Sequence, residues 1–321
     1  MIISLGTATL DIILKSQKID SISLGDKVKV DNIFFALGGG AVNAAATFAN
    51  LQLNCRAYFR LGDDLISQII LSKIKQAKIK YHIFQHQGES QFSMIFLSAN
   101  AERTIFVYRG IANEFTLSEL LSVPQQKYYY LTTANTKPRI FNQFLKNIYD
   151  KSLLIGINPS DFFLTEIKSA ELFSLIDILF INTEEADTLL NIKKDKNKID
   201  DFKIGKEIFK KFKLKVLVLT RGRRGSIVFF QNKAFVSDIF KPKIIEDTTG
   251  AGDAFASAFL GKLIIDKINR YNLSERHILE AIKWGSANAS ANIEKLGAQI
   301  GILKKKDYLK YKNLNFYLKN I

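Results

Sequence analysis

The most informative stretch of this sequence reads DTTGAGDAF and occupies residues 247–255. Small residues lead directly into a segment with a helical pattern, so backbone N–H groups are left open where that helix begins. These N–H groups and the helix dipole together form an anion site. Gly250 and Gly252 also let the backbone approach a phosphoryl group without a Cβ clash. We therefore expect the amides of Gly250, Ala251 and Gly252 to bind a phosphoryl group.

A carboxylate, that of Asp253, stands within this expected anion site. A carboxylate repels a bound anion, so its position is best explained if it accepts a proton from a hydroxyl that attacks the phosphoryl group. The alternative is that Asp253 only caps the helix and that the glycines only make the turn. A bare Gly-x-Gly would favour that alternative, whereas the full DTTGAGD pattern before a helix of small residues favours a catalytic base.

A second glycine-rich element reads LGGGAVNA and occupies residues 37–44. It follows a segment with a half-exposed strand pattern and precedes an alanine-rich helical segment. The glycines fit either a hinge or a place where the backbone approaches a ligand closely. Asn43, on the first helical turn, offers a donor and an acceptor to a ligand hydroxyl. This element alone supports a tight turn and a binding site equally.

Short, continuous apolar runs alternate with helical patterns through the middle of the chain. The runs occupy residues 128–131, 153–157, 178–181 and 216–219. Continuous apolar runs suit strands that are covered on both faces. Strands and helices that alternate at this spacing predict a parallel, doubly wound α/β sheet.

Other segments alternate between polar and apolar residues instead. Residues 22–36 alternate in this way, as in KVKV at 27–30, and residues 91–97 and 104–108 form a second pair that a hairpin loop at 98–103 would connect. A period of two predicts strands with one wet face. We therefore expect a small antiparallel sheet, with one face unburied, that acts as a lid over a deeper core.

This lid is expected to come from about residues 13–37 and 91–110 of a single α/β domain that spans residues 1–321. The chain has 321 residues, of which 47% are hydrophobic and 24% are charged. That composition excludes a disordered chain and supplies enough apolar material for a large core.

The chain is strongly basic, with a formal net charge of +15 and a pI of about 9.6. A basic balance can reflect a nucleic-acid or anionic-membrane partner. The lysines here are scattered and lack the aromatic residues of RNA-binding motifs. We therefore expect solvated lysines that attract an anionic small molecule, with neither nucleic acid nor membrane as a partner.

Cysteine and histidine are too scarce for several classes of site. With Cys55 as the single cysteine, and three histidines, the chain has no internal disulfide and little material for a zinc site. The N-terminus lacks a basic leader, and no apolar stretch approaches the roughly 20 residues of a spanning helix. We expect a soluble, cytoplasmic protein.

Together, the two glycine-rich elements resemble the signature regions of the ribokinase-like, or PfkB, family of carbohydrate kinases. Those regions are similar to residues 38–51 and 247–260, and the order of further motifs extends the resemblance over almost the whole chain. The resemblance implies a ribokinase-like three-layer α/β/α fold, with a mostly parallel central sheet and a small antiparallel β lid. It also implies that ATP phosphorylates a hydroxyl, by expectation a primary alcohol, of a small sugar.

The resemblance implies an acceptor site beside the lid. Asp11 would accept hydrogen bonds from substrate hydroxyls, Gly38 and Gly39 would form the hinge, and Asn43 would bind substrate. Arg109 lies in a Tyr-Arg-Gly pattern similar to that of some fructokinases and keto-deoxy-sugar kinases. It either binds a carboxylate, phosphate or sugar hydroxyl or is a solvated arginine of an edge strand, and both readings stay open.

The resemblance also implies a nucleotide site. An Asn-x-x-Glu motif gives Asn182 and Glu185 the task of acting, largely through water, on Mg²⁺ and phosphate. Without the resemblance, these residues would indicate a helix start capped by Asn182. The TRGRRG motif would bring Thr220 and the backbone of Gly222 to the ATP phosphates or ribose, and Gly225 belongs to the same motif or serves the turn after it.

Further family positions lie in the C-terminal part of the chain. Asn288 is a candidate nucleotide contact, and residues 297–298 resemble the loop that closes the adenine pocket. The resemblance also allows a monovalent cation, K⁺, near Asp247 and Thr249.

Two departures from the family leave the acceptor open. Residues 158–160 read NPS where many relatives have Asp-Pro-Asn, and residues 132–135 lack the substrate-contacting glutamate of ribokinases. The alternatives to a sugar kinase are a nucleoside kinase of the adenosine type and a catalytically silent member that binds a sugar or nucleotide. A homodimer through the lid sheet is a further expectation from the family.

Overall fold

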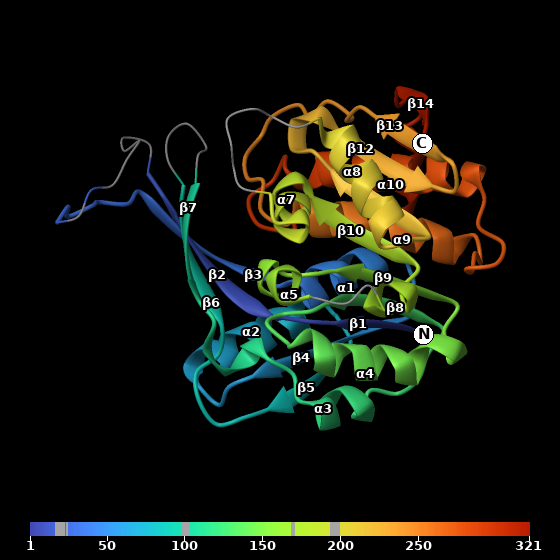
Figure 1. The fold of residues 1–321 in the computed structure, drawn as a ribbon. Coiled ribbons are helices and arrows are strands. Elements are labelled where there is room, and N and C mark those ends of the chain that lie inside the picture. The colour runs from blue at the N-terminus through green and yellow to red at the C-terminus, as the bar shows by residue number, and fades with distance from the viewer. Residues whose placement is uncertain (17–22, 24, 98–102, 168–170, 193–199) are drawn as a thin grey trace.

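The computed structural model describes most of the chain, namely residues 1–16, 23, 25–97, 103–167, 171–192 and 200–321. It shows a large α/β core from which a smaller sheet projects to one side (Figure 1). No helix in these described ranges is both long enough and apolar enough to cross a membrane.

The core is built on a sheet that has ten strands within the described residues. From one edge to the other these are β14 (Phe316–Asn320), β13 (Lys233–Ser237), β12 (Ser226–Phe230), β11 (Val216–Thr220), β10 (Ile178–Asn182), β9 (Leu154–Asn158), β8 (Tyr128–Thr132), β1 (Ile2–Leu5), β4 (Cys55–Leu61) and β5 (Tyr81–Gln85). All neighbours from β11 to β5 are parallel, and β12 to β14 continue the sheet antiparallel. The four apolar runs predicted as buried parallel strands are confirmed as β8 to β11.

These strands are apolar throughout because both faces of the sheet are covered. Val216 and Val218 of β11 face one hydrophobic cluster, whereas Leu217 and Leu219 face another cluster on the opposite side. Alternate side chains of a strand point to opposite faces, so a strand between two helical layers must be hydrophobic at every position.

Two helical layers provide this cover (Figure 1). One layer contains α1 (Gly40–Asn50), α2 (Leu65–Gln76), α9 (Ala251–Ile265) and α10 (Glu275–Asn292). The other contains α3 (Leu117–Ser122), α4 (Pro138–Ile148), α5 (Asp161–Glu166), α6 (Glu171–Ser174), α7 (Thr183–Leu190) and α8 (Asp201–Lys211). Short 3-10 helices occupy Gly110–Asn113, Tyr149–Lys151, Gly222–Arg224 and Lys305–Lys310. The expected three-layer α/β/α arrangement is confirmed.

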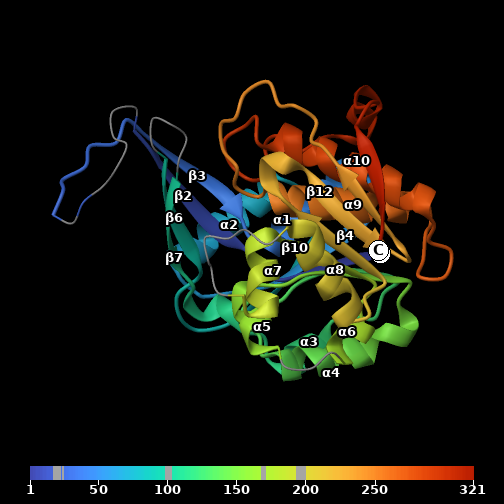
Figure 2. The ribbon, with the colours of Figure 1, turned by 45° about the horizontal axis from the view of Figure 1, so that its top comes forward.

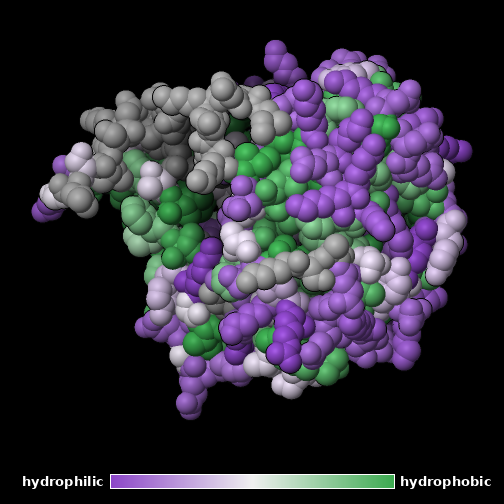
Figure 3. Space-filling view, in the orientation of Figure 1, coloured by the Kyte–Doolittle hydropathy of each residue, from purple (hydrophilic) through white to green (hydrophobic). Residues whose placement is uncertain are grey.

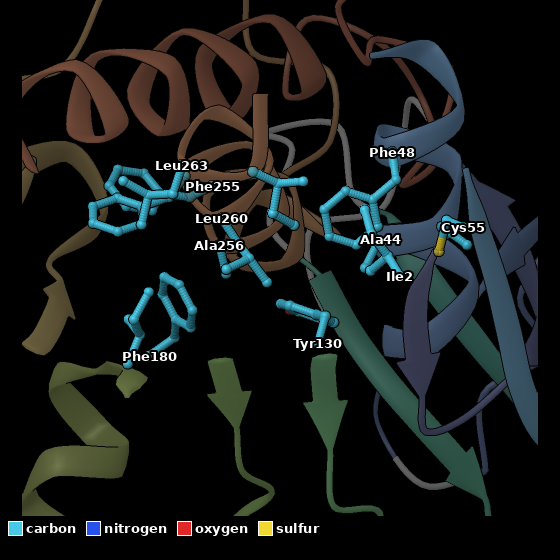
Figure 4. Close-up of a cluster of buried hydrophobic side chains, with 14 of the residues drawn as sticks. Ile2, Ala44, Phe48, Cys55, Tyr130, Phe180, Phe255, Ala256, Leu260 and Leu263 are labelled. Atoms are coloured by element: carbon cyan, nitrogen blue, oxygen red, sulfur yellow. The ribbon is translucent and has the colours of Figure 1, made fainter. Parts of the chain in front are cut away.

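The helix α9 is buried on nearly all sides, because α1, α10 and the sheet all pack against it. Figure 4 shows Ala256, Leu260 and Leu263 of α9 above the strands. A helix that is apolar all round belongs inside a protein rather than on its surface. The residues just before and within its first turn are those of the DTTGAGDAF motif.

The lid is a separate sheet with four strands in the described part of the chain, and it projects beyond the core in two views (Figures 1 and 2). Its order is β3 (Asn32–Gly38), β2 (Thr9–Lys15), β6 (Phe92–Leu97) and β7 (Arg103–Tyr108). The pairs β2–β3 and β6–β7 are antiparallel hairpin partners, and β2 pairs with β6 in parallel. The small sheet assembled from two separated segments is therefore confirmed.

The alternating segment at 22–36 does contribute a lid strand, but that strand begins later than the pattern indicated. Residues 27–30 form no strand, and the strand of this segment begins at Asn32. The Lys-Val alternation has the period of a strand, but a strand also needs a partner, and β2 pairs with residues 32–38 instead. Most of the expected hairpin loop at 98–103 lies outside the described residues, and Arg103 already belongs to β7.

Candidate active site

Polar residues gather at the carboxyl edge of the parallel strands. Asn158 ends β9, Asn182 ends β10 and Thr220 ends β11, which are neighbours in the sheet. Ligands of open α/β sheets bind at this edge. A small pocket of about 80 Å³ lies here, lined by Asn158, Phe180, Ile181, Asn182, Glu185, Thr220, Gly252 and Ala256. The structure thus brings together Asn182, Glu185, Thr220 and Gly252, which the sequence motifs predict separately.

The expected anion turn lies at the start of α9. Gly250 has φ 76°, the left-handed conformation that favours glycine, and the helix begins at Ala251. A Cβ at Gly250 would also lie 2.5 Å from the Cβ of Ala298. By contrast, no described atom lies within 4 Å of the position that a Cβ would take at Gly252. The turn is therefore packed at Gly250 and open at Gly252, and the amide of Ala251 donates a hydrogen bond to Thr248 O at 3.4 Å.

Asp253 is held by three side chains that come from different elements. Its Oδ2 accepts a hydrogen bond from Asn43 Nδ2 at 3.0 Å. Its Oδ1 accepts hydrogen bonds from the Tyr130 hydroxyl at 3.2 Å and from Asn158 Nδ2 at 3.4 Å. Burial raises the pKa of the Asp253 carboxyl, and these donated hydrogen bonds oppose the rise. The carboxylate is thus fixed at the front of α9, half-buried beside the open turn.

Tyr130 is a site residue that sequence reasoning missed. Its ring is fully buried between Phe48 of α1 and Phe180 of β10 (Figure 4). In the sequence it lies in an ordinary apolar strand run, so only its hydroxyl hinted at a polar role. Knowing that β8 lies beside β9 in the sheet would have placed this hydroxyl under the start of α9.

The expected acceptor residues gather where the lid joins the core. Asp11 of β2 is 5% exposed, and burial raises the pKa of its carboxyl to about 7, with Asp247 and Asp253 adding to the rise. Gly38 ends β3, where it pairs with Thr9 of β2, and a Cβ there would lie 2.2 Å from Asp11 Oδ2. Gly39 caps α1, on which Asn43 is buried.

Arg109 is exposed just after β7, next to Tyr108, whose hydroxyl donates a hydrogen bond to Glu89. This position is compatible with both interpretations of Arg109, so its role stays a prediction.

Asn182 and Glu185 form a capping box at the start of α7. Asn182 Oδ1 accepts hydrogen bonds from the amides of Glu184 and Glu185, and Glu185 Oε2 accepts one from the amide of Asn182 at 2.8 Å. The capping interpretation is therefore correct, and it does not exclude the other one, because Glu185 also lines the small pocket.

The electrostatics of Glu185 suit a divalent cation. Burial raises the pKa of its carboxyl to about 7, and Asp161, Asp253 and Glu184 add to the rise. A nearby Mg²⁺ would stabilise the charged form. The described residues contain no cluster of three or more His, Cys, Asp or Glu that could hold a metal. Mg²⁺ usually keeps several waters and uses few carboxylates, so Glu185 fits such an ion held through water.

The TRGRRG segment turns back at a short 3-10 helix. The Thr220 hydroxyl faces Ile181 O at 3.5 Å, and Gly222 is exposed. Gly225 is buried, and a Cβ there would lie 1.9 Å from Ser237 O. Gly225 is thus placed as a turn residue against β13, whereas Thr220 lines the pocket.

Asn288 does not lie where a direct nucleotide contact would place it. It is fully buried in α10, and its Nδ2 donates hydrogen bonds to Ala254 O at 2.9 Å and to Thr47 Oγ1 at 3.4 Å. Its Oδ1 accepts a hydrogen bond from the amide of Leu303. The expectation of a nucleotide contact is corrected here: Asn288 fastens α10 to α9 and α1.

Asp247 connects the anion turn to the expected adenine loop. Its Oδ1 accepts a hydrogen bond from the amide of Thr249 at 2.8 Å, and its Oδ2 accepts one from the amide of Gly297 at 3.0 Å. The carboxylate therefore ties together two loops that are 50 residues apart in sequence.

Comparison with known proteins shows the family to which the chain belongs. The family model described as "pfkB family carbohydrate kinase" matches residues 1–305. The chain belongs to the PfkB family. This PfkB protein is thus an ATP-dependent carbohydrate kinase with a ribokinase-like fold.

Its relatives match over most of their own length. The kinase is 26% identical over 286 residues to a ribokinase of Staphylococcus aureus, covering 87% of this chain and 89% of the relative. It is 23% identical over 273 residues to a nucleoside kinase of Methanocaldococcus jannaschii, covering 83% of this chain and 82% of the relative.

Solved structures show the same fold. A ribokinase from Giardia lamblia matches with a TM-score of 0.82 and 20% identity, covering 96% of this chain and 98% of that one. An Arabidopsis thaliana ribokinase complexed with ribose and ATP matches with a TM-score of 0.73 and 20% identity, covering 97% of both chains.

Proposed function

We propose that this kinase transfers the γ-phosphoryl group of ATP to a hydroxyl, by preference a primary alcohol, of a small sugar. One observation carries the proposal: Asp253 is fixed beside the glycine turn at the start of α9, which is open at Gly252, at the carboxyl edge of the parallel strands. Phosphoryl transfer depends mainly on positioning and charge stabilisation, which this arrangement supplies.

Each part of the site has a task in this mechanism. Asp11 and Asn43 hold the acceptor hydroxyls, and Asp253 takes the proton of the attacking hydroxyl. The amides of the Gly250–Gly252 turn face the negative charge that develops on the phosphoryl oxygens. Thr220 and Gly222 lie on the nucleotide side. Mg²⁺ held through water by Glu185, with Asn182 beside it, would neutralise charge on the phosphates when bound.

Asp11 and Asn43, which gather where the lid joins the core, suit the hydroxyl groups of a sugar and equally those of the ribose in a nucleoside. A sugar is preferred because the matching family model is one of carbohydrate kinases. The relatives include both ribokinases and a nucleoside kinase, so their names alone leave this choice open. A catalytically silent member is less well supported, because Asp253 and the open turn are both intact. The cytoplasm, where ATP is abundant, is the proposed location.

The experiment is ATP turnover over a panel of ribose, fructose, keto-deoxy acids, sugar phosphates and nucleosides, with the product identified by ³¹P NMR. We expect one sugar class to be phosphorylated and to raise the melting temperature by mass action. Turnover of nucleosides alone would replace the sugar with the alternative. Stabilisation by a sugar without turnover of any acceptor would support the silent binding protein instead.

A monovalent cation is a finer part of the proposal. Asp247 and Thr249 lie just before Gly250, and Asp247 ties this segment to the loop at Gly297, so K⁺ there would fix the turn. Replacing K⁺ with Na⁺ or with a tetraalkylammonium salt at constant ionic strength should lower kcat. An unchanged rate would remove the cation from the proposal.

We further propose that the lid sheet forms a homodimer. The lid exposes many large apolar side chains, and Figure 3 shows hydrophobic surface on the lid beside the hollow between lid and core. These side chains are Ile33, Phe34, Phe35, Met94, Ile105, Phe106, Val107 and Tyr108. Apolar patches of this kind mark interaction sites. Light scattering should show a dimer that Phe106→Asp dissociates and that Leu309→Asp, an exposed apolar position outside the lid, leaves intact.

A further inference from the structure

The catalytic carboxylate is the end of a longer chain of side-chain hydrogen bonds. Gln299 Nε2 donates to Asn43 Oδ1 at 3.0 Å, and Asn43 Nδ2 donates to Asp253 Oδ2 at 3.0 Å. The three residues come from the loop after α10, from α1 and from α9. Gln299 belongs to no motif that the sequence analysis singled out.

We propose that Gln299 is a positioning residue that sets the orientation of the Asn43 amide and, through it, of Asp253. This inference rests on the proposed roles of Asn43 in acceptor binding and of Asp253 as the base.

The chemistry of the three groups fixes the direction of the chain. An ionised carboxylate can only accept, so Asn43 must turn its NH₂ group toward Asp253. The carbonyl oxygen of Asn43 then faces Gln299, which must present its own NH₂ group. This leaves Asn43 with one N–H and one lone pair for a ligand, which is the pair needed by a hydroxyl that both accepts and donates.

The burial of Asn43 makes its partner important. Asn43 is 5% exposed, so loss of Gln299 would leave its carbonyl oxygen with little access to water. An unpaired buried acceptor is costly, and the amide would rotate to find another partner. Every rotation that turns the carbonyl oxygen toward Asp253 replaces an attraction with a repulsion.

Gln299 is mounted on a loop that is itself fastened to the anion turn. Asn292 Nδ2 donates to Ala298 O at 2.8 Å, the amide of Gly297 donates to Asp247, and Ala298 packs on Gly250. The glutamine is therefore held in a fixed place relative to both the phosphoryl site and the acceptor site, as a positioning residue must be.

The test is a double-mutant cycle between Gln299→Met and Asn43→Ala, with Gln125→Met as the matched control. Gln125 is an exposed glutamine that donates to Asn147 O on the opposite helical layer. The acceptor is D-ribose, or adenosine if the wild type does not phosphorylate ribose. In the wild-type background we expect Gln299→Met to raise the acceptor KM roughly tenfold, the effect of one hydrogen bond. The KM for ATP should change less than about twofold.

In the Asn43→Ala background, the same substitution should have almost no further effect, because its partner is gone. If Gln299→Met raises the acceptor KM equally in both backgrounds, or changes it in neither, the proposal is overturned. Gln125→Met should match the wild type throughout.

A second readout does not depend on turnover. The Asn43 side-chain NH₂ resonance, identified by its loss in Asn43→Ala, should shift in Gln299→Met and in Asp253→Asn but not in Gln125→Met. If Gln299→Met does not shift this resonance, the proposed hydrogen-bond chain is overturned. Full activity of Asp253→Asn, with the resonance shifting as expected, would instead reject the proposed function and keep the hydrogen-bond chain.

Discussion

The central sheet and the lid sheet contain similar apolar residues, but the central sheet buries them and the lid sheet exposes them. Val216 and Leu217 of the central sheet are fully buried between two helical layers. In the lid, Ile33 is 53% exposed and Phe106 is 60% exposed. Burial of apolar surface is the main source of folding stability, so the core holds the fold together while the lid contributes little to it. A lid that is weakly held can move and can bind a partner.

The largest expected effect separates core and lid by stability. Phe141→Ala removes a fully buried ring that packs against Phe144 and Phe163, and should lower the free energy of unfolding by about 3–5 kcal/mol. Phe106→Ala in the lid should lower it by about 0.5 kcal/mol or less. Urea titration of dilute protein measures both. A lid loss as large as the core loss would mean that the lid patch is covered even in dilute solution.

The next effect removes the chemistry at the edge of the core without touching the lid. Asp253→Asn should lower kcat by more than about a hundredfold, because the variant cannot take the proton of the acceptor hydroxyl. ATP binding, measured by calorimetry, should be nearly unchanged. Near-normal turnover in a folded Asn variant would refute the role of Asp253 as base.

A smaller effect is the pH dependence of stability that arises from two carboxyl groups, Glu185 in the core and Asp11 where lid and core meet. The pKa values of Glu185 and Asp11 are raised to about 7 by burial, so the ligand-free protein binds more protons there than the unfolded chain does. Their contribution to stability is therefore largest below the unfolded pKa values, near 4, and is lost as the pH rises to about 7.

The neutral variants Glu185→Gln and Asp11→Asn should escape this loss. At pH 8 each should be more stable than the wild type by about 1 kcal/mol or more, and the gain should fade toward pH 4. Melting temperatures across this range test the sign. A gain that grows as the pH falls would contradict the burial of these groups in the ligand-free state.

Sequence patterns predicted the core well because each buried strand is encoded by its own local run of apolar residues. The run at 216–219 is hydrophobic at every position, and that alone indicates a strand between two covered faces. The DTTGAGDAF motif likewise placed the start of α9 and its open glycine turn.

The errors and omissions have a common physical cause, which is contact between distant parts of the chain. The alternation at 27–30 lacked a partner strand, and the polar side chain of Asn288 was used for packing. Tyr130 and Gln299 joined the site only because folding brings them to α9 and α1 from 123 and 256 residues away. No local pattern records such pairings.

The burial of α9 has a practical consequence for anyone who wishes to redesign this enzyme. Because α9 packs tightly against the sheet and two other helices, the turn at its N-terminus will stay in the same position whichever acceptor alcohol is offered. New acceptors should therefore be sought by varying the lid strands near Asp11, which are less tightly packed than α9. Libraries that randomise α9 should yield mostly unfolded variants.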